Sequence, residues 1–233
     1  MLNWENHDNE VILCRRCPRL VAWREDVARK RRKAYLDWEY WGKPVPGFGD
    51  HQARLLVVGL APGAHGSNRT GRMFTGDSSG DFLYAALHRA GFANQPSSSN
   101  REDGLTLNDV FISAVCRCAP PDNKPSPAEI ANCLPFLAAE MRVLQRIEGI
   151  VALGRIAFDY SLRLQPRGGR QLLGFQFSHG VFFPFGEGLP WILASYHPSR
   201  QNTQTGRLTV EMFDSIWEKA RNEMDRSGLN ERG

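Results

Sequence analysis

The sequence predicts an α/β fold with a central, mostly parallel four-stranded sheet flanked by helices. Two observations support this: four short apolar, partly β-branched runs are separated by segments of helical periodicity, and each run is continuously apolar. Strands of this kind are buried on both faces, as in a parallel sheet that helices cover on either side. The chain has 233 residues, of which 42% are hydrophobic, so we expect a single domain over residues 1–233.

The expected strands and helices follow from the apolar pattern and from capping residues. The strands are Leu55–Leu60, Val110–Val115, Gly149–Leu153 and Trp191–Tyr196. Helices are expected from near Gly80 through the apolar stretch Phe82–Leu87, after Ser126, and over Thr209–Asp225. Ser126 is a candidate N-cap, because Pro127 follows at the first helical position and Glu129 completes a capping box.

The remaining segments give weaker patterns. The chain looks helical up to Trp41 and irregular over residues 44–50, and Ala93–Gly104 reads as a polar loop. The segment Gln171–Phe185 predicts a hairpin that turns near His179 and Gly180.

The composition argues against a membrane or secreted protein. No apolar run approaches the ~20 residues of a membrane-spanning helix, and the N-terminus has neither the basic start nor the apolar core of a signal peptide. We therefore expect a cytoplasmic protein without a membrane partner. The formal net charge is +4, and nine Lys or Arg residues lie between Arg15 and Lys33. Such a cluster suits a polyanion, or is simply the solvated face of a helix.

The five cysteines need an explanation, because disulfides are rare in the cytoplasm. Cys14 and Cys17 form a C-x-x-C pair, while Cys118 and Cys133 lie far downstream and Cys116 is close to Cys118. A local pair with two distant thiols can close a four-thiolate site for zinc or for an iron–sulfur cluster. The alternative is a set of unrelated buried cysteines. A four-thiolate site would tie the N-terminal segment 1–50 to the core.

Two polar loops follow expected strands and suggest a functional site. The stretch Gly59–Gly80 is too long and too rich in specific polar groups for a linker. The second loop, His197–Thr203, follows the last strand, and ligands of such sheets bind beyond the carboxyl ends of the strands. The first loop lacks both the Gly-Lys-Ser/Thr of a phosphate loop and the G-x-G-x-x-G spacing of a dinucleotide-binding fold.

These features together resemble the uracil-DNA glycosylase superfamily, and closely its iron–sulfur family 5. The resemblance covers nearly the whole chain and rests on five segments: Cys14–Glu25, Glu39–Asp50, Gly59–Gly80, Cys118–Cys133 and His197–Thr209. It implies hydrolysis of the N-glycosidic bond of uracil, and of other deaminated bases such as hypoxanthine and xanthine, in DNA. It also implies a 4Fe–4S cluster held by Cys14, Cys17, Cys118 and Cys133, with Cys116 as the spare thiol. We expect a monomer.

The resemblance also suggests which residues carry the chemistry. Asp77 is the candidate general base, which orients water and stabilises the cationic sugar; its alternative role is to cap the helix near Gly80. His197 would donate a hydrogen bond to the departing base. Asn123 would help to hold the water, or is simply a turn residue. Phe74 would stack on the base, or is simply a core residue.

The remaining candidates would bind the base or the DNA. Backbone amides in the loop would line the base pocket, since glycine and small residues allow close approach; the residues concerned are Gly59, Ala61, Gly63 and Ala64. His65 and Asn68 would contact sugar or phosphate, and Arg200, Gln201 and Asn202 would enter the minor groove. Ala114 aligns with an Asn that reads uracil in related families, so base choice should be relaxed.

A different class of function also fits part of the sequence. A non-catalytic iron–sulfur module that binds damaged DNA would keep the basic cluster and the cysteines without needing Asp77. Cleavage of a uracil-containing oligonucleotide would separate the two functions.

Overall fold

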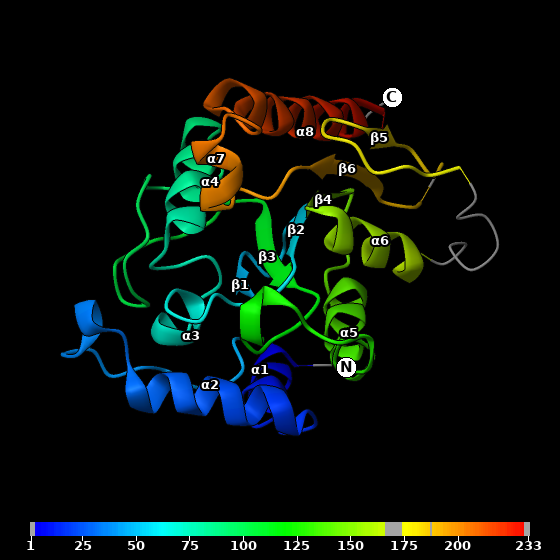
Figure 1. Cartoon of the computed structure of the whole chain (residues 1–233). Helices are drawn as coiled ribbons and strands as arrows, with labels where there is room; N and C mark the ends of the chain where they lie inside the picture. The colour runs from blue at the N-terminus through cyan, green and yellow to red at the C-terminus, as the bar shows by residue number, and fades with distance from the viewer. Residues whose placement is uncertain (1–2, 166–173, 187, 231–233) are drawn as a thin grey trace.

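The computed structural model describes residues 3–165, 174–186 and 188–230 and contains one six-stranded sheet (Figure 1). The strand order is β1-β3-β2-β4-β6-β5. The four central strands, which pair in parallel, are β2 (Leu55–Gly59), β3 (Val110–Ala114), β4 (Gly149–Leu153) and β6 (Trp191–Ser195). The predicted parallel centre is therefore confirmed.

The sheet has two more strands than predicted. β1 (Phe48–Gly49) pairs antiparallel with β3, and β5 (Phe182–Phe183) pairs antiparallel with β6. Each is only two residues long, too short to produce a recognisable period in the sequence. The fold is mixed α/β, with a parallel centre and an antiparallel strand at each edge.

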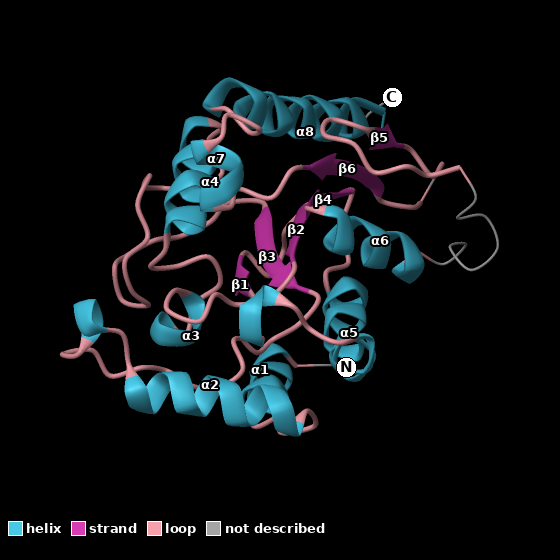
Figure 2. Ribbon diagram, viewed as in Figure 1, coloured by secondary structure: helices cyan, strands magenta, loops and turns pink. Residues whose placement is uncertain are grey.

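Helices cover both faces of the sheet (Figure 2). The α-helices are α1 (Trp4–Ile12), α2 (Pro18–Lys30), α3 (Ser67–Thr70), α4 (Ser78–Arg89), α5 (Pro127–Val143), α6 (Arg155–Leu164), α7 (Arg200–Gln204) and α8 (Val210–Asn230), with 3-10 turns η1 (Lys33–Tyr35) and η2 (Pro121–Asn123). In β2, Leu55 and Val57 pack under α4 and α8, whereas Leu56 and Val58 pack under α5 and α6. Burial on both faces explains why the strand is continuously apolar.

The predicted start of α5 is confirmed in detail. The Ser126 Oγ accepts a hydrogen bond from the Glu129 amide at 3.3 Å, and the Glu129 carboxylate accepts one from the Ser126 amide at 2.7 Å. Pro127 occupies the first turn. The reciprocal bonds satisfy two amides that would otherwise lack partners.

The N-terminal segment is more broken than predicted. The chain leaves α1 after Ile12 and begins α2 at Pro18, since proline is favoured in a first turn and disfavoured inside a helix. The helix α2 ends at Lys30, and the next residue, Arg31, has a left-handed φ of 54°. Only the turn η1 follows, so the expectation of helix up to Trp41 was wrong beyond Tyr35.

The predicted hairpin over Gln171–Phe185 is present only in part. Residues 171–173 lie outside the described residues, and a turn is found at His179 and Gly180 as expected. Residues 175–178 form no strand, and β5 pairs with β6 instead. The edge of β6 offers unpaired backbone groups, which β5 satisfies.

In the part of the chain that the structure describes, no helix is both long and apolar enough to span a membrane.

Candidate active site

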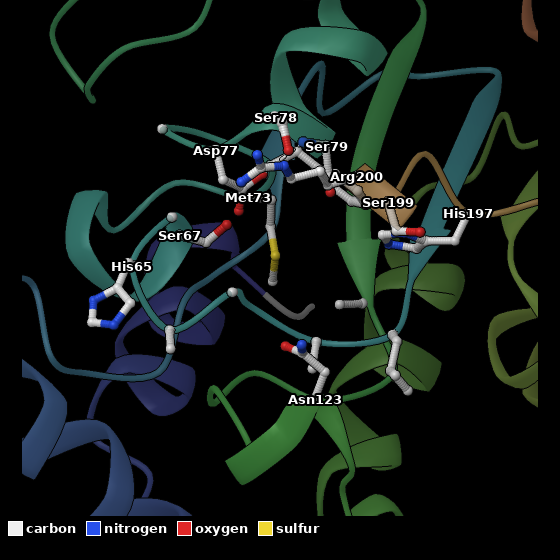
Figure 3. Close-up of a pocket in the computed structure, with 18 of the residues that line it drawn as sticks. His65, Ser67, Met73, Asp77, Ser78, Ser79, Asn123, His197, Ser199 and Arg200 are labelled. Atoms are coloured by element: carbon white, nitrogen blue, oxygen red, sulfur yellow. Dashed lines mark hydrogen bonds between the residues drawn. The ribbon is translucent and has the colours of Figure 1, made fainter. Parts of the chain in front are cut away.

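A pocket of about 740 Å³ lies beyond the carboxyl ends of the central strands (Figure 3). Its walls come from the loop after β2, from Ala114 at the end of β3, from Asn123 in η2, and from the loop after β6 that carries His197. This volume is within the usual range for pockets that bind small molecules, a class of ligand whose size is that of a single flipped nucleotide. The topology thus brings both polar loops of the sequence analysis to one cavity.

The two carboxylate oxygens of Asp77 have different surroundings. Its Oδ1 accepts hydrogen bonds from the amides of Ser79 and Gly80, both at 3.1 Å, and so caps α4. Its Oδ2 accepts no hydrogen bond within the described chain and lies among the residues that line the pocket. The pKa of Asp77 is raised, mainly because burial disfavours the charged form. The two interpretations of Asp77, cap and pocket carboxylate, are therefore compatible.

Two glycines make room for this carboxylate. A Cβ atom would lie 2.7 Å from Asp77 Oδ2 if placed on Gly63, and 2.0 Å from it on Gly66. Both distances are too short for a real contact, so a side chain at either position would displace the carboxylate. The glycine-rich sequence of the loop lets the backbone wrap closely around Asp77.

Phe74 forms the opposite part of the pocket wall with His197. Their ring centroids are 5.9 Å apart and the planes are inclined by 29°. Phe74 has a φ of 51°, which is uncommon for a residue with a side chain and marks a constrained loop. β2 ends in Gly59 because a Cβ there would lie 2.8 Å from the Phe74 ring.

His197 is neutral at neutral pH. Burial lowers the pKa of its imidazole to about 4. Its backbone carbonyl accepts a hydrogen bond from Asn202 Nδ2 at 2.8 Å, which fixes the loop after β6. A neutral imidazole can donate one hydrogen bond to an oxygen without first losing or gaining a proton.

Most of the predicted site residues line the pocket. They are the residues already described, Asp77, Phe74, His197, Asn123 and Ala114, together with Ala61, Gly63, Ala64, His65, Arg200 and Gln201. Figure 3 shows His65 and His197 on opposite sides of the cavity, with Asn123 between them at its edge. Asn123 has a left-handed φ of 55°, a conformation that asparagine tolerates better than most residues.

Three predicted binding residues do not face the pocket. Asn68 is fully buried and donates hydrogen bonds to the carbonyls of Arg24 and Ala64, so it has no access to sugar or phosphate. Asn202 is half-buried, does not line the pocket, and donates a hydrogen bond from Nδ2 to the His197 carbonyl. Gly59 lies behind the Phe74 ring rather than in the pocket wall. In this structure, all three residues contact other parts of the protein around the pocket.

Several pocket residues were missed by the sequence analysis. Met73 projects its sulfur into the cavity (Figure 3), and Arg32 and Tyr35 line it from the segment after α2. Met73 precedes Phe74 in the same loop, so its neighbour could have indicated it. Arg32 and Tyr35 are about 40 residues before Met73 and Phe74 in the sequence, and no local pattern marks their long-range placement.

Four of the five cysteines line a second, small cavity between α2, α5 and the end of β3. These are Cys14, Cys17, Cys118 and Cys133, whereas the fully buried Cys116 does not line it. Three of the sulfurs accept N–H hydrogen bonds: Cys118 from Arg24 at 3.1 Å, Cys133 from the Arg117 amide at 3.2 Å, and Cys17 from Asn132 at 3.7 Å. All five thiols are free of disulfides. Within the described residues, no three ligating side chains converge to mark a metal site by position alone.

Residues 46–221 match the family model of the uracil DNA glycosylase superfamily. The chain belongs to this superfamily. The type-5 uracil-DNA glycosylase of Mycobacterium leprae is 53% identical over 213 residues, covering 91% of this chain and 92% of the relative. That of Thermus thermophilus is 51% identical, covering 91% and 94% respectively. The type-4 uracil-DNA glycosylase of Pyrobaculum aerophilum is 33% identical and covers only 58% of this chain. The sequence is thus similar to type-5 members of the superfamily along most of its length.

Proposed function

We propose that the protein is a uracil-DNA glycosylase of DNA repair, a hydrolase that cleaves the N-glycosidic bond of uracil flipped out of DNA. The observation that carries this proposal is the pocket carboxylate of Asp77, opposite the Phe74 and His197 rings, at the carboxyl edge of the sheet. The 43–53% identity to type-5 relatives supports the same activity.

The pocket residues divide the reaction between them. Extrusion of the nucleotide from the helix costs a few kcal/mol, which stacking on the Phe74 ring and contacts with the loop backbone offset. Asp77 Oδ2 faces the cavity and orients the attacking water. The same negative charge stabilises the oxocarbenium-like sugar that forms as the bond to the base breaks.

The departing base takes up negative charge, and His197 is suited to meet it. Its imidazole is uncharged above pH about 4, so it donates a hydrogen bond from a neutral ring. A donor aimed at charge that develops only in the transition state accelerates the reaction more than it tightens ground-state binding.

The finer proposal is that hypoxanthine and xanthine are also released. Ala114 is 1% exposed and presents only a methyl group to the pocket. It offers neither a donor nor an acceptor to the Watson–Crick edge of the base. A pocket that reads mainly a carbonyl group, through backbone amides and His197, does not distinguish uracil from deaminated purines by that edge.

A 4Fe–4S cluster held by Cys14, Cys17, Cys118 and Cys133 is the second finer proposal. Four thiolates are the donor set such clusters use, and the N–H bonds to three of the sulfurs are the kind that stabilise a thiolate ligand. When bound, the cluster supplies four covalent links between α2, the end of β3 and α5. The Arg24 guanidinium and the Arg117 backbone amide, which donate hydrogen bonds to Cys118 and Cys133, would help to hold two of these sulfurs.

The proposal is tested with oligonucleotides that carry one uracil, hypoxanthine or xanthine. A glycosylase leaves an abasic site, which alkali converts into a strand break. We expect breaks at all three bases and none in an undamaged control. Retention of the damaged oligonucleotide on the protein without base release would favour the non-catalytic binding module instead.

A further inference from the structure

The structure divides the basic cluster of residues 15–33 into engaged and unengaged cations. Seven of the nine side chains have partners: Arg15 with Glu25, Arg16 with the Phe136 ring, Arg19 with Glu129, Arg24 with Cys118, Arg29 and Lys30 with Asp26, and Arg31 with the Leu36 carbonyl. Arg32 and Lys33 are exposed, and neither side chain forms a hydrogen bond or an ion pair within the described residues.

Of these two unengaged cations, Arg32 lies at the base pocket, and Lys33 is its neighbour in the chain. Arg32 lines the pocket directly. The pKa of His65 is lowered mainly by burial, and the nearby charge of Arg32 lowers it further. The segment after α2 lies beside α3 and far from α7, the helix that begins with Arg200 (Figure 1). Since Arg200 also lines the pocket, positive charge reaches the pocket from two separate parts of the fold.

The segment that carries Arg32 and Lys33 is fixed to the long loop after β2, Gly59–Gly80. The Arg69 guanidinium lies 4.0 Å from the ring centroids of both Tyr35 and Trp38, and donates to the carbonyls of His65 and Gly76. The Tyr40 hydroxyl lies 3.3 Å from the Arg32 amide and 3.0 Å from His65 Nδ1. Because the backbone that carries the two cations is held in place, binding a ligand through them costs less entropy than it would on a free loop.

We propose that Arg32 and Lys33 form a phosphate clamp that binds the backbone of the damaged DNA strand beside the flipped nucleotide, across the pocket from Arg200. The clamp rests on the proposed function, because it assigns a DNA phosphate to these cations. Phosphate contacts position a strand without reading its sequence, which suits an enzyme that must accept damage in any context.

The test is the salt dependence of binding to an oligonucleotide with one 2′-fluoro-deoxyuridine, which resists cleavage. We compare the wild type with the double variant Arg32→Ala/Lys33→Ala and with the matched control Arg29→Ala/Lys30→Ala, which removes the same charge from the adjacent turn. At 0.1 M salt the clamp variant should raise the Kd by roughly 10- to 60-fold and reduce the slope of log Kd against log salt by about 2. The control should change the Kd less than about 3-fold, and Arg32→Lys/Lys33→Arg should keep the wild-type slope.

A second measurement locates the phosphate. Neutral methylphosphonates are placed one at a time in the damaged strand around the uracil. At the clamp position the substitution should weaken the wild type and have no further effect on Arg32→Ala/Lys33→Ala. An unchanged slope, an equal loss in the control, or additive losses at every position would overturn the clamp. Failure of the wild type to release uracil would refute the proposed function instead, so the two failures are distinguishable.

Discussion

At the scale of single residues, Asp77 combines a structural role with the catalytic role proposed for it. Oδ1 caps α4, while Oδ2 faces the pocket in the space left by Gly63 and Gly66. An N-cap aspartate needs only one oxygen for the helix, so the other is available to a ligand. The helix start fixes the orientation of the carboxylate.

Replacement of this carboxylate separates its two tasks. Asn is as good an N-cap as Asp, so Asp77→Asn should retain the fold and the thermal midpoint to within a few degrees. It removes the negative charge, and single-turnover release of uracil at saturating enzyme should slow by ~10²–10⁴-fold. A variant with a near-wild-type rate would leave Asp77 only as a helix cap.

The pH dependence of the same reaction follows from the pKa of Asp77. As the proposed general base, Asp77 would act when ionised, and burial raises its pKa above the ordinary value of 3.8. The single-turnover rate should therefore rise with pH on an acid limb displaced upward from that of a free carboxyl group. Asp77→Asn should lose this limb, and its survival in the variant would assign it to another group.

The proposed base choice can also be tested at a single position. Ala114 pairs in register with Gly59, and its methyl group borders the cavity. Ala114→Asn adds an amide able to pair with the uracil edge and bulk that collides with purines. We expect the ratio of uracil to hypoxanthine release, measured as kcat/KM, to rise by at least 10-fold. An unchanged ratio would mean that base choice is set elsewhere in the pocket.

At the scale of elements, sequence reasoning succeeded where a strand is buried on both faces and failed where placement is long-range. β2 is visible because Leu55–Gly59 is buried throughout, whereas β1 has two residues and no period. The site loops were predicted because each follows such a strand. Arg69, clasped by Tyr35 and Trp38, could not be predicted, because its partners are more than 30 residues away and only the fold brings them together.

The cysteine-lined cavity also lies between elements that are far apart in the sequence. It predicts that substitutions of different cysteines have different effects on iron content and yield. Cys118→Ala removes a proposed ligand between β3 and α5, so the variant should lose visible absorbance, bound iron and much of its soluble yield. Cys116→Ala, outside the cavity, should retain all three. The measurements are iron content and the absorption spectrum of freshly purified protein. Equal iron in the two variants would contradict the ligand set.

At the scale of the whole molecule, the parallel sheet gathers distant chemistry at one edge. The loops after β2, β3 and β6 are spread over more than 100 residues of the chain yet meet in one pocket, since the carboxyl ends of the central strands all point there. The pocket is partly closed to water, which desolvates Asp77 and His197 alike. Burial of these groups links the site to the stability of the fold.

That link predicts how stability depends on pH. His197 has a pKa of about 4 in the folded protein and about 6.5 in an unfolded chain. Between these values the unfolded chain binds a proton that the folded state does not, so the free energy of unfolding should fall as pH falls from 6.5 toward 4, and the His197 contribution should level off below that. The loss due to this residue is on the order of 3 kcal/mol.

Urea unfolding at pH 7.5 and pH 4.5 measures this effect when the wild type is compared with His197→Gln. Other groups titrate in the same range, and burial also lowers the pKa values of His65 and His179, but these groups are common to both proteins. The variant cannot take up the proton when unfolded, so its free energy of unfolding should fall less between the two pH values. Equal losses in the two proteins would mean that His197 is protonated in the folded state at pH 4.5. The neutral hydrogen-bond donor proposed for catalysis would then be present only well above that pH, and the activity should fall as the pH approaches it.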